Sequence, residues 1–301
     1  MQMQKQLSLE QVVTCGLEKN TAATVLPQIN QWLSSLSACE CWQQLTQHIL
    51  TPTHPFALHQ LLYRVTQQKS SSGVLCRHSP SDFTWALLMA AARPVVEADR
   101  FTRAGQWQTW EPDLLLGSAI TGATLGILGL GRIGQAVARR AKGFELQILY
   151  ANQYRCDPEL EQSLGVEFVT FDRLLQESDF VTIHTPLTED TFHLFGDRQF
   201  EQMKRSAILI NTARGLIVDP NALYRALTSH QIAAAALDVT DPEPIPTHSP
   251  LLTLDNLIIT PHIGSATRPT REKMARMAIA NLVAGLNGDC LPHCVNPEVY
   301  Q

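Results

Sequence analysis

The sequence predicts an α/β fold built around a parallel sheet, and two observations support this prediction. From residue 124 onward, short runs of aliphatic and β-branched residues alternate with amphipathic stretches, as strands alternate with crossover helices in a parallel sheet. A glycine-rich turn of the form G-x-G-x-x-G joins the first run to the first amphipathic stretch. With 301 residues, the chain is long enough for this unit and a second, smaller lobe.

The first 72 residues follow a different pattern. They contain a single glycine, Gly16, and twelve glutamines within the first 68 positions. The spacing of apolar residues in segments 25–36 and 41–50 is helical and not strand-like. The segment SSSG at 70–73 has the composition of a hinge or linker, so it separates this region from the rest of the chain.

A helix is expected to begin at Ser81 or Asp82 and to extend to Gly105. Pro94 lies in its middle, where proline removes a backbone hydrogen bond and clashes with the preceding turn, at a cost of about 3 kcal/mol. The segment is therefore either one kinked helix or two helices.

The parallel sheet is expected to draw on seven apolar runs. These runs are 124–128, 146–151, 166–171, 179–184, 207–213, 234–239 and 256–261. Four stretches between them repeat apolar residues at three- and four-residue spacing and predict crossover helices. These stretches are 132–143, 171–178, 197–205 and 220–231.

Composition narrows the classes of function. The formal net charge is −5, from 23 Lys and Arg against 28 Asp and Glu, and no lysine-rich block occurs, so nucleic acid is not an expected partner. Neither a signal peptide nor a run of about 18 apolar residues is visible, and a soluble, cytoplasmic protein is expected. The seven cysteines predict reduced thiols, and the C-x-C at Cys39 and Cys41 has no further ligands nearby, so no metal site is expected.

The glycine-rich turn predicts a Rossmann-type dinucleotide site. Gly129 allows the tight turn, Gly131 lets the backbone approach a pyrophosphate, and Gly134 lets the helix pack on the strand. The helix that follows presents free N–H groups and a partial positive charge to the phosphates. The alternative is a glycine turn with a structural role only.

The end of the second strand run bears on the choice of cofactor. An NAD-binding protein places Asp or Glu about twenty residues after the glycine turn, on the ribose 2′-hydroxyl. This chain has Asn152 and, three residues later, Arg155. A neutral side chain with a nearby guanidinium favours a 2′-phosphate, hence NADP(H) over NAD(H). The alternative is that Arg155 is a solvated surface residue.

Three ionisable residues follow later strand runs: Arg214 in NTARG, Glu243 in DPEP and His262 in TPHIG. The carboxyl ends of parallel strands meet at one crevice, so these side chains are expected to converge. A guanidinium can bind the carboxylate of a 2-oxo acid, and a histidine oriented by a carboxylate can donate the proton that accompanies hydride transfer. The alternatives are two surface charges and a structural histidine.

Several long motifs of the chain are similar to the motifs of one protein family. They are LGILGLGRIGQAVARRA, LLQESDFVTIHTPLT, INTARGLIVD, ALDVTDPEP and TPHIGSAT. Over roughly residues 80 to 300 the chain resembles the D-isomer-specific 2-hydroxyacid dehydrogenases. Within them it is most similar to glyoxylate/hydroxypyruvate reductases, which include 2-ketogluconate reductases.

The resemblance implies roles for individual residues. His262 would be the proton donor, Glu243 its partner and Arg214 the substrate-binding arginine. Further positions would contact the cofactor: Arg132, Ile133, Thr185, Pro186, Thr191, Ala213, Asp238 and Gly264. The resemblance also implies a homodimer and a cofactor domain, residues 76–267, inserted into a smaller substrate domain made of 1–75 and 268–301.

The N-terminal region departs from the family pattern. Family members open with a flavodoxin-like lobe in which a Val-Gly-x-Asp loop holds the substrate carboxylate, and the corresponding stretch ILTPTHPF has no glycine. An atypical or incomplete substrate domain is therefore expected. Two hypotheses follow: NADPH-dependent reduction of glyoxylate, hydroxypyruvate or 2-ketogluconate to the D-2-hydroxy acid, or a dinucleotide-binding member that is catalytically impaired, either decayed or regulatory.

Overall fold

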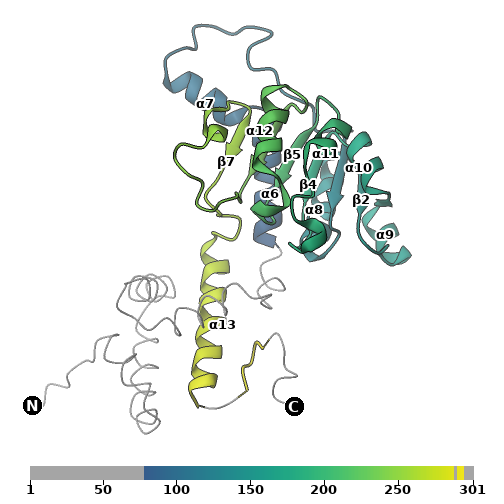
Figure 1. Cartoon of the computed structure of the whole chain (residues 1–301), viewed down its shortest axis with the longest axis vertical. Coiled ribbons are helices and arrows are strands. Elements are labelled where there is room, and N and C mark those ends of the chain that lie inside the picture. The colour runs from purple at the N-terminus through teal and green to yellow at the C-terminus, as the bar shows by residue number, and fades with distance from the viewer. Residues whose placement is uncertain (1–77, 288–289, 295–301) are drawn as a thin grey trace, which may run out of the picture. The chain divides into compact units, whose positions relative to one another are not determined.

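The computed structural model describes residues 78–287 and 290–294 (Figure 1). The chain divides into two compact units, one formed by residues 77–265 and the other by 1–76 together with 266–301. The assignment of 1–75 and 268–301 to a substrate domain is still a prediction, because most of those residues lie outside the described part.

The first unit is built on a seven-stranded parallel sheet with the order β3-β2-β1-β4-β5-β6-β7. The strands are β1 (Thr124–Leu128), β2 (Gln147–Ala151), β3 (Glu167–Phe168), β4 (Phe180–Ile183), β5 (Ile208–Asn211), β6 (Ala234–Leu237) and β7 (Leu257–Ile259). Each lies inside one of the apolar runs expected from the sequence. The predicted α/β fold with a parallel sheet is confirmed.

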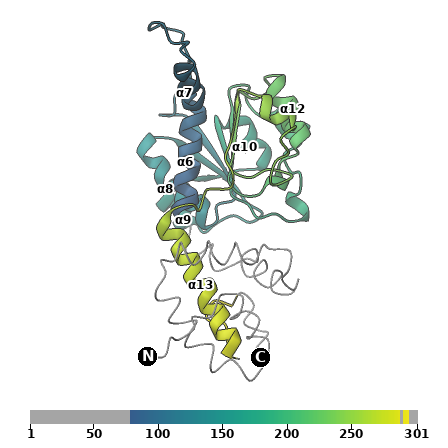
Figure 2. The same cartoon turned by 90° about the vertical axis from the view of Figure 1, so that its left-hand side faces the viewer.

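The helices cover both faces of this sheet (Figure 2). They are α6 (His78–Ala92), α8 (Arg132–Ala141), α9 (Pro158–Leu164), α10 (Phe171–Glu177), α11 (Asp197–Gln202) and α12 (Pro220–Thr228). A further helix, α7 (Val95–Arg103), follows α6 and has no buried residue. Short 3-10 turns occur at Lys142–Phe144, Glu189–Thr191, Gly215–Ile217 and Pro250–Thr253.

Two apolar clusters form the core, one on each side of the sheet. One cluster joins Leu125 and Ile127 of β1 to Trp85 and Leu88 of α6. The other includes Leu128, also from β1, with residues of α10, α11 and α12. Because both faces are covered, the strands are buried almost throughout, which explains why the sequence shows continuous apolar runs without alternation.

The register brings the carboxyl ends of the central strands to one level. Leu128 of β1 pairs with Ala151 of β2 and Ile183 of β4, and further pairs join β4 to β5, β5 to β6 and β6 to β7. The last of these pairs place Asn211, Leu237 and Ile259 in one row. The loops that follow therefore start from the same edge of the sheet.

The segment around Pro94 forms two helices. α6 ends at Ala92 and α7 begins at Val95, so Pro94 breaks the predicted helix. α6 already includes His78, upstream of the predicted start at Ser81 or Asp82, and Ser79 is buried and donates to the Gly264 carbonyl at 2.7 Å. This long-range bond is not visible in the sequence.

α9 was not among the predicted helices. Its seven residues carry only two leucines, too few for a clear apolar stripe. Its ends nevertheless follow the rules for caps: Asp157 accepts from the Glu159 N–H at 2.8 Å, Pro158 occupies the first position, and Gly165 ends the helix with φ +68°.

The second unit contributes α13 (Arg268–Asn287) to the described residues. Near its end, Asn281 accepts a hydrogen bond from the His293 N–H at 2.9 Å. Among residues 78–287 and 290–294, no helix has the length and apolar character needed to cross a bilayer.

Candidate active site

The glycine-rich turn has the geometry that a dinucleotide site requires. Gly129 has φ +98°, and a Cβ there would lie 2.6 Å from the Thr185 nitrogen. At Gly134 a Cβ would lie 2.2 Å from the Gly129 oxygen, where α8 packs on the turn. At Gly131 a Cβ would meet nothing within 4 Å. Packing thus requires glycine at positions 129 and 134, whereas Gly131 borders open space where a pyrophosphate could approach.

The first turn of α8 offers unpaired N–H groups to that space. Its N-cap is Gly131, which has no side chain to cap the helix, and Gln135 is the first residue whose N–H is satisfied, by the Gly131 carbonyl at 2.9 Å. Arg132 is exposed and Ile133 half-buried in this turn. The residues present therefore fit a nicotinamide dinucleotide with its pyrophosphate on the helix N-terminus.

The loop after β4 lies against the same turn. Gly129 packs on the backbone of His184 and Thr185. Thr191 braces the loop, since its hydroxyl accepts from the Thr188 N–H at 2.7 Å and donates to the Pro186 carbonyl at 2.8 Å. The predicted cofactor contacts of Thr185, Pro186 and Thr191 are not tested by this geometry.

The end of β2 is tied to the glycine-rich turn through Asn152. Its side-chain oxygen accepts from the Leu130 N–H at 2.7 Å. Arg155 is exposed, as the alternative of a surface arginine requires, and it also forms a bidentate ion pair with Glu161 of α9. Glu161 was missed at the sequence level, because an acidic residue in a short polar helix carries no signal of its own.

His262 and Glu243 form the central pair of the site. The distance between His262 Nδ1 and Glu243 Oε1 is 2.5 Å, and both side chains are about half exposed. Glu243 follows β6 and His262 follows β7, so neighbouring strand ends bring them together. The predicted pairing is therefore present in the structure.

A buried carboxylate holds the loop that carries His262. Asp238, at the end of β6, is 2% exposed. Its oxygens accept from the Thr260 hydroxyl at 2.7 Å, the Ile263 N–H at 2.8 Å and the Gly264 N–H at 2.7 Å. His262 itself has φ +54°, a conformation that L-residues seldom adopt. Asp238 thus fixes an unusual loop conformation through three hydrogen bonds, and its predicted contact with the cofactor is not tested by this geometry.

Arg214 follows β5 and is exposed. Nη1 donates to the Ala213 carbonyl at 2.6 Å, and the Asn211 side chain brackets the turn by donating to the Arg214 carbonyl at 2.9 Å and accepting from the Ala213 N–H at 3.0 Å. A Cβ on Gly215 would lie 1.9 Å from the Thr240 oxygen, so the loops after β5 and β6 touch at this glycine. The strand order therefore places Arg214 one loop away from Glu243.

Two other histidines near the site differ from His262. The ring Nε2 of His184 is buried without a hydrogen-bond partner, and burial lowers its pKa to about 4. Nε2 of His193 lies 3.5 Å from an Asp241 oxygen. His184 is therefore neutral at physiological pH and cannot serve as the proton donor.

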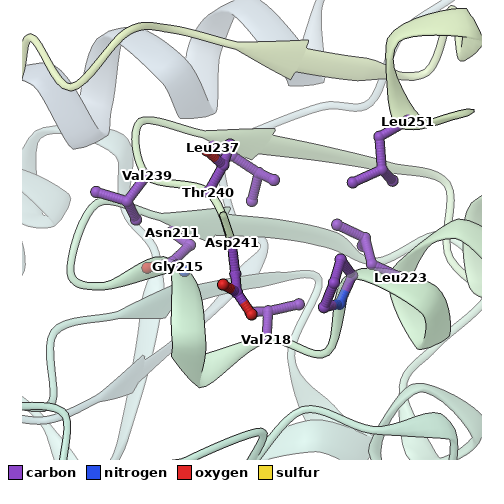
Figure 3. Close-up of a pocket in the computed structure, with 10 residues that line it drawn as sticks. Asn211, Gly215, Val218, Leu223, Leu237, Val239, Thr240, Asp241 and Leu251 are labelled. Atoms are coloured by element: carbon purple, nitrogen blue, oxygen red, sulfur yellow. The ribbon is translucent and has the colours of Figure 1, made fainter. Parts of the chain in front are cut away.

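A small hollow lies behind the loops that carry Arg214 and Glu243 (Figure 3). Apolar side chains, among them Leu223, Leu237 and Leu251, surround it, with Asp241 at one side. Arg214, Glu243 and His262 do not line it. Its apolar lining marks it as packing space behind the site. No cluster of His, Cys, Asp or Glu that could bind a metal occurs among the residues that the structure describes.

Two family models match the chain. Residues 85–264 match the model described as D-isomer specific 2-hydroxyacid dehydrogenase, NAD binding domain. Residues 2–66 match a different one, described as probable acyl-activating enzyme 17/18, SAM domain. The second match falls on residues outside the described structure.

Individual relatives agree with the first match. The chain is 52% identical over 233 residues to a glyoxylate reductase of Korarchaeum cryptofilum and 47% identical over 234 residues to one of Thermococcus litoralis. These alignments cover 77% and 76% of this chain, and 70% of each relative.

Solved structures give the same result. The crystal structure of the TT0316 protein from Thermus thermophilus is similar with a TM-score of 0.70 at 47% identity, covering 75% of this chain and 70% of that one. A glyoxylate reductase from Paecilomyes thermophila is similar with a TM-score of 0.65 at 35% identity, covering 73% and 66%.

The site and the comparisons lead to one assignment. The glycine-rich turn and the uncapped helix form a nicotinamide dinucleotide site, and the loops at the adjoining strand ends carry the histidine, carboxylate and arginine suited to a small 2-oxo or 2-hydroxy acid. The protein is accordingly an oxidoreductase with a Rossmann-type NAD-binding domain. The chain belongs to the D-isomer specific 2-hydroxyacid dehydrogenase family.

Proposed function

We propose that the chain uses NADPH to reduce a small 2-oxo acid, namely glyoxylate, hydroxypyruvate or 2-ketogluconate, to the D-2-hydroxy acid, with His262 as proton donor. The observation that carries this proposal is the 2.5 Å contact between His262 Nδ1 and Glu243 Oε1 at the carboxyl edge of the sheet. The name glyoxylate reductase, borne by relatives about 50% identical, supports the substrate class.

His262 would protonate the carbonyl oxygen. A bound nicotinamide dinucleotide supplies the hydride to the carbonyl carbon, and the oxygen then needs one proton to become a hydroxyl. Glu243 occupies Nδ1, which leaves Nε2 for the substrate. Nε2 carries a proton to donate only in the imidazolium form, so reduction begins with His262 charged and ends with it neutral.

Glu243 would act by orienting the imidazole and stabilising its charged form. A carboxylate that accepts from Nδ1 fixes the ring orientation and favours the imidazolium through its charge. The Glu243 side chain is 42% exposed to solvent. Its role is therefore positional and electrostatic, and the proton itself passes from Nε2.

Arg214 would bind the substrate. Its guanidinium is exposed and uses one N–H on the Ala213 carbonyl, which leaves donors for a carboxylate. A planar guanidinium can hold two oxygens of a 2-oxo acid at once, which fixes the face that the carbonyl presents. Loss of this arginine should raise KM as well as lower kcat.

The preference for NADPH rests on Arg155 and on the absence of an acidic residue at Asn152. An acid there would accept from the ribose 2′-hydroxyl of NADH and repel a 2′-phosphate. Asn152 is neutral, and its side-chain oxygen accepts a hydrogen bond from the Leu130 N–H. Arg155 is the cation that follows the strand and keeps N–H donors not used by Glu161.

The test is an assay of absorbance at 340 nm with NADPH and then NADH, against glyoxylate and hydroxypyruvate, with His262→Ala as the control variant. Turnover with NADPH should fall by about 10²- to 10⁴-fold in the variant, the contribution typical of a general acid. NADPH affinity should not change. Turnover that persists in the variant would remove His262 from the mechanism.

A second candidate function is favoured by one observation. Residues 2–66 match the acyl-activating enzyme SAM domain model, and the family match begins only at residue 85. A chain whose substrate lobe is incomplete would bind the dinucleotide without useful turnover, as a decayed or regulatory member. NADPH would then raise the melting temperature while neither 2-oxo acid is reduced, which separates the two candidates in one set of samples.

We also infer a homodimer from the segment after α7. Trp107, Trp110 and Leu116 are 61%, 79% and 73% exposed, large apolar side chains on one short stretch. Apolar side chains gathered in this way are typical of protein interfaces. A second copy of this chain is the partner that the sequence predicts, and the cytoplasmic location expected from the sequence is likewise still a prediction.

A further inference from the structure

A buried carboxylate lies against the exposed arginine that follows β2. The side chain of Glu161 is 9% exposed, whereas that of Arg155 is 62% exposed. Arg155 Nε donates to Glu161 Oε1 at 2.9 Å and Nη2 donates to Oε2 at 2.8 Å. The buried partner therefore anchors the exposed one through two parallel hydrogen bonds.

A residue of the sheet also binds the Glu161 carboxylate. The hydroxyl of Tyr150, a fully buried residue of β2, donates to Glu161 Oε1 and accepts from the Cys156 N–H at 2.9 Å. Hydrogen bonds from Arg155 and Tyr150 lower the pKa of Glu161 to about 2, so it is ionised at neutral pH. The Arg155 guanidinium also lies 5.9 Å from the centre of the Phe168 ring. The arginine is thus held in one place by packing and by charge.

The pair stands where a cofactor ribose is expected. β2 ends level with β1, and Asn152 binds the glycine-rich turn directly. A guanidinium has five N–H donors, and Glu161 uses two of them. Arg155 makes no further hydrogen bond within 78–287 and 290–294, which leaves both donors of Nη1 and one of Nη2 for a ligand.

We propose that Glu161 is a positioning residue for cofactor choice: it fixes Arg155 so that the remaining donors bind the 2′-phosphate of the adenosine ribose. This inference rests on the NADPH preference proposed above. The Glu161–Arg155 pair is neutral overall. Discrimination between NADPH and NADH therefore arises from short hydrogen bonds to the 2′-phosphate in a fixed geometry, more than from long-range charge attraction. A modest preference for the phosphorylated cofactor follows, and it depends on the carboxylate that holds the arginine.

The test measures binding and does not require turnover. The full-length protein is titrated calorimetrically with adenosine 2′,5′-bisphosphate and with AMP, and the ratio of the two affinities reports recognition of the 2′-phosphate. In Glu161→Gln this ratio should fall about five- to tenfold, while AMP affinity changes less than about twofold, as for the loss of one ordered charge-assisted contact. Arg155→Ala should give the lower limit of the ratio.

A double variant tests whether Glu161 acts through Arg155. In the Arg155→Ala background, Glu161→Gln should leave the ratio unchanged, because there is no guanidinium left to position. Glu161→Asp keeps the charge but is shorter by one methylene, so it should lower the ratio as well. This variant also provides the test if Glu161→Gln fails to fold.

The chain offers a matched control. Asp197 and Arg225 form another bidentate pair, at 2.9 and 2.7 Å, with one partner in α11 and the other in α12. Asp197→Asn should leave the ratio of affinities as in the unmodified protein. A general effect of breaking an ion pair would lower it here too, which would count against a specific role of Glu161.

Two results for Glu161→Gln, and one for the unmodified protein, would overturn the inference. An unchanged ratio in Glu161→Gln would make the pair a structural element only, and a higher ratio would mean that Glu161 repels the phosphate. If the unmodified protein does not distinguish the two probes, the NADPH preference itself fails and this inference fails with it. Loss of 2-oxo acid reduction alone would refute the proposed catalysis and would leave this binding result intact.

Discussion

At the level of single residues, the chain separates histidines by environment. His262 is half exposed and paired through Nδ1 with a carboxylate, whereas Nε2 of His184 is buried without a hydrogen-bond partner. The sequence identifies His262 through its place in TPHIG after a strand run, and it says nothing of the environment of His184 in TIHTP.

Glu243→Gln should impair reduction by way of the imidazolium. The amide can still accept from Nδ1 but carries no charge, so the charged form of His262 loses stabilisation. We expect kcat to fall about 10- to 100-fold while KM changes less than about threefold. Steady-state kinetics at a fixed neutral pH measure both.

The control for this experiment is NADPH affinity, which should be equal in the variant and the unmodified protein. An unchanged kcat in Glu243→Gln would contradict an electrostatic role of Glu243 and would leave only a steric role for the side chain.

His184 should make stability depend on pH. The unfolded chain takes up a proton near pH 6.5, whereas burial lowers the pKa of the folded residue to about 4. The stabilisation that comes from keeping this histidine neutral is therefore fully present above pH 6.5 and is lost as the pH falls toward 4. At about 1.4 kcal/mol per pH unit, roughly 3 kcal/mol of unfolding free energy is involved.

Denaturant unfolding of the full chain between pH 7.5 and 4, compared with His184→Gln, measures this effect. The difference in unfolding free energy between the two proteins should change with pH in the direction just given. His248→Gln, at an exposed histidine, is the control for the loss of one imidazole from the chain. Parallel curves for His184→Gln would show that the ring titrates normally in the folded state.

At the level of elements, the glycine-rich turn gives the sharpest contrast. Gly131→Ala should fold normally, because its Cβ meets nothing within 4 Å and its φ of −75° suits any residue. It should still lose dinucleotide affinity, about 10-fold or more, because the methyl group occupies the space for a pyrophosphate. Gly134→Ala places a Cβ 2.2 Å from the Gly129 oxygen and should lower the melting temperature.

Thermal unfolding with and without NADPH tests both variants together. Gly131→Ala should have the melting temperature of the unmodified protein and show little stabilisation by NADPH, and Gly134→Ala should melt earlier without any ligand. If Gly131→Ala binds NADPH normally, the pyrophosphate does not approach the backbone at this turn.

The elements also show how far the sequence could be used to predict the fold. All seven strands lie within predicted runs, because burial on both faces leaves continuous apolar stretches that are hard to mistake. α9 was missed because its stripe has only Leu160 and Leu164, although Asp157 and Gly165 mark both ends. Glu161 could be suspected only from Tyr150, whose hydroxyl on a buried strand requires a partner.

At the level of the whole molecule, the chain spans about 70% of the length of its relatives, and residues 2–66 match the model of an unrelated family. The three candidate catalytic residues and the cofactor turn belong to residues 77–265, so they were predictable from motifs within one unit. The substrate lobe was not, because its carboxylate loop has no counterpart in the sequence and the residues concerned lie outside the described structure.

The exposed segment after α7 leads to a prediction about assembly. Trp110 and Leu116, 79% and 73% exposed, lie in the connection from α7 to β1 and belong to neither apolar cluster. In a symmetric dimer each side chain acts twice, and an interface anchor contributes about 2 kcal/mol, so removing one anchor weakens association by a factor on the order of 10³. Trp110→Ser combined with Leu116→Ser should therefore convert a dimer to monomers of 33.4 kDa at micromolar concentration.

Sedimentation equilibrium distinguishes the two states. Leu252→Ser is the control, since Leu252 is 47% exposed and lies in the separate turn at Pro250–Thr253, so it should leave the dimer intact. A monomeric unmodified protein would refute the dimer, and a double variant that stays dimeric would move the interface elsewhere. If the variant is monomeric yet still reduces 2-oxo acids, each copy contains a complete site, and the segment serves assembly alone.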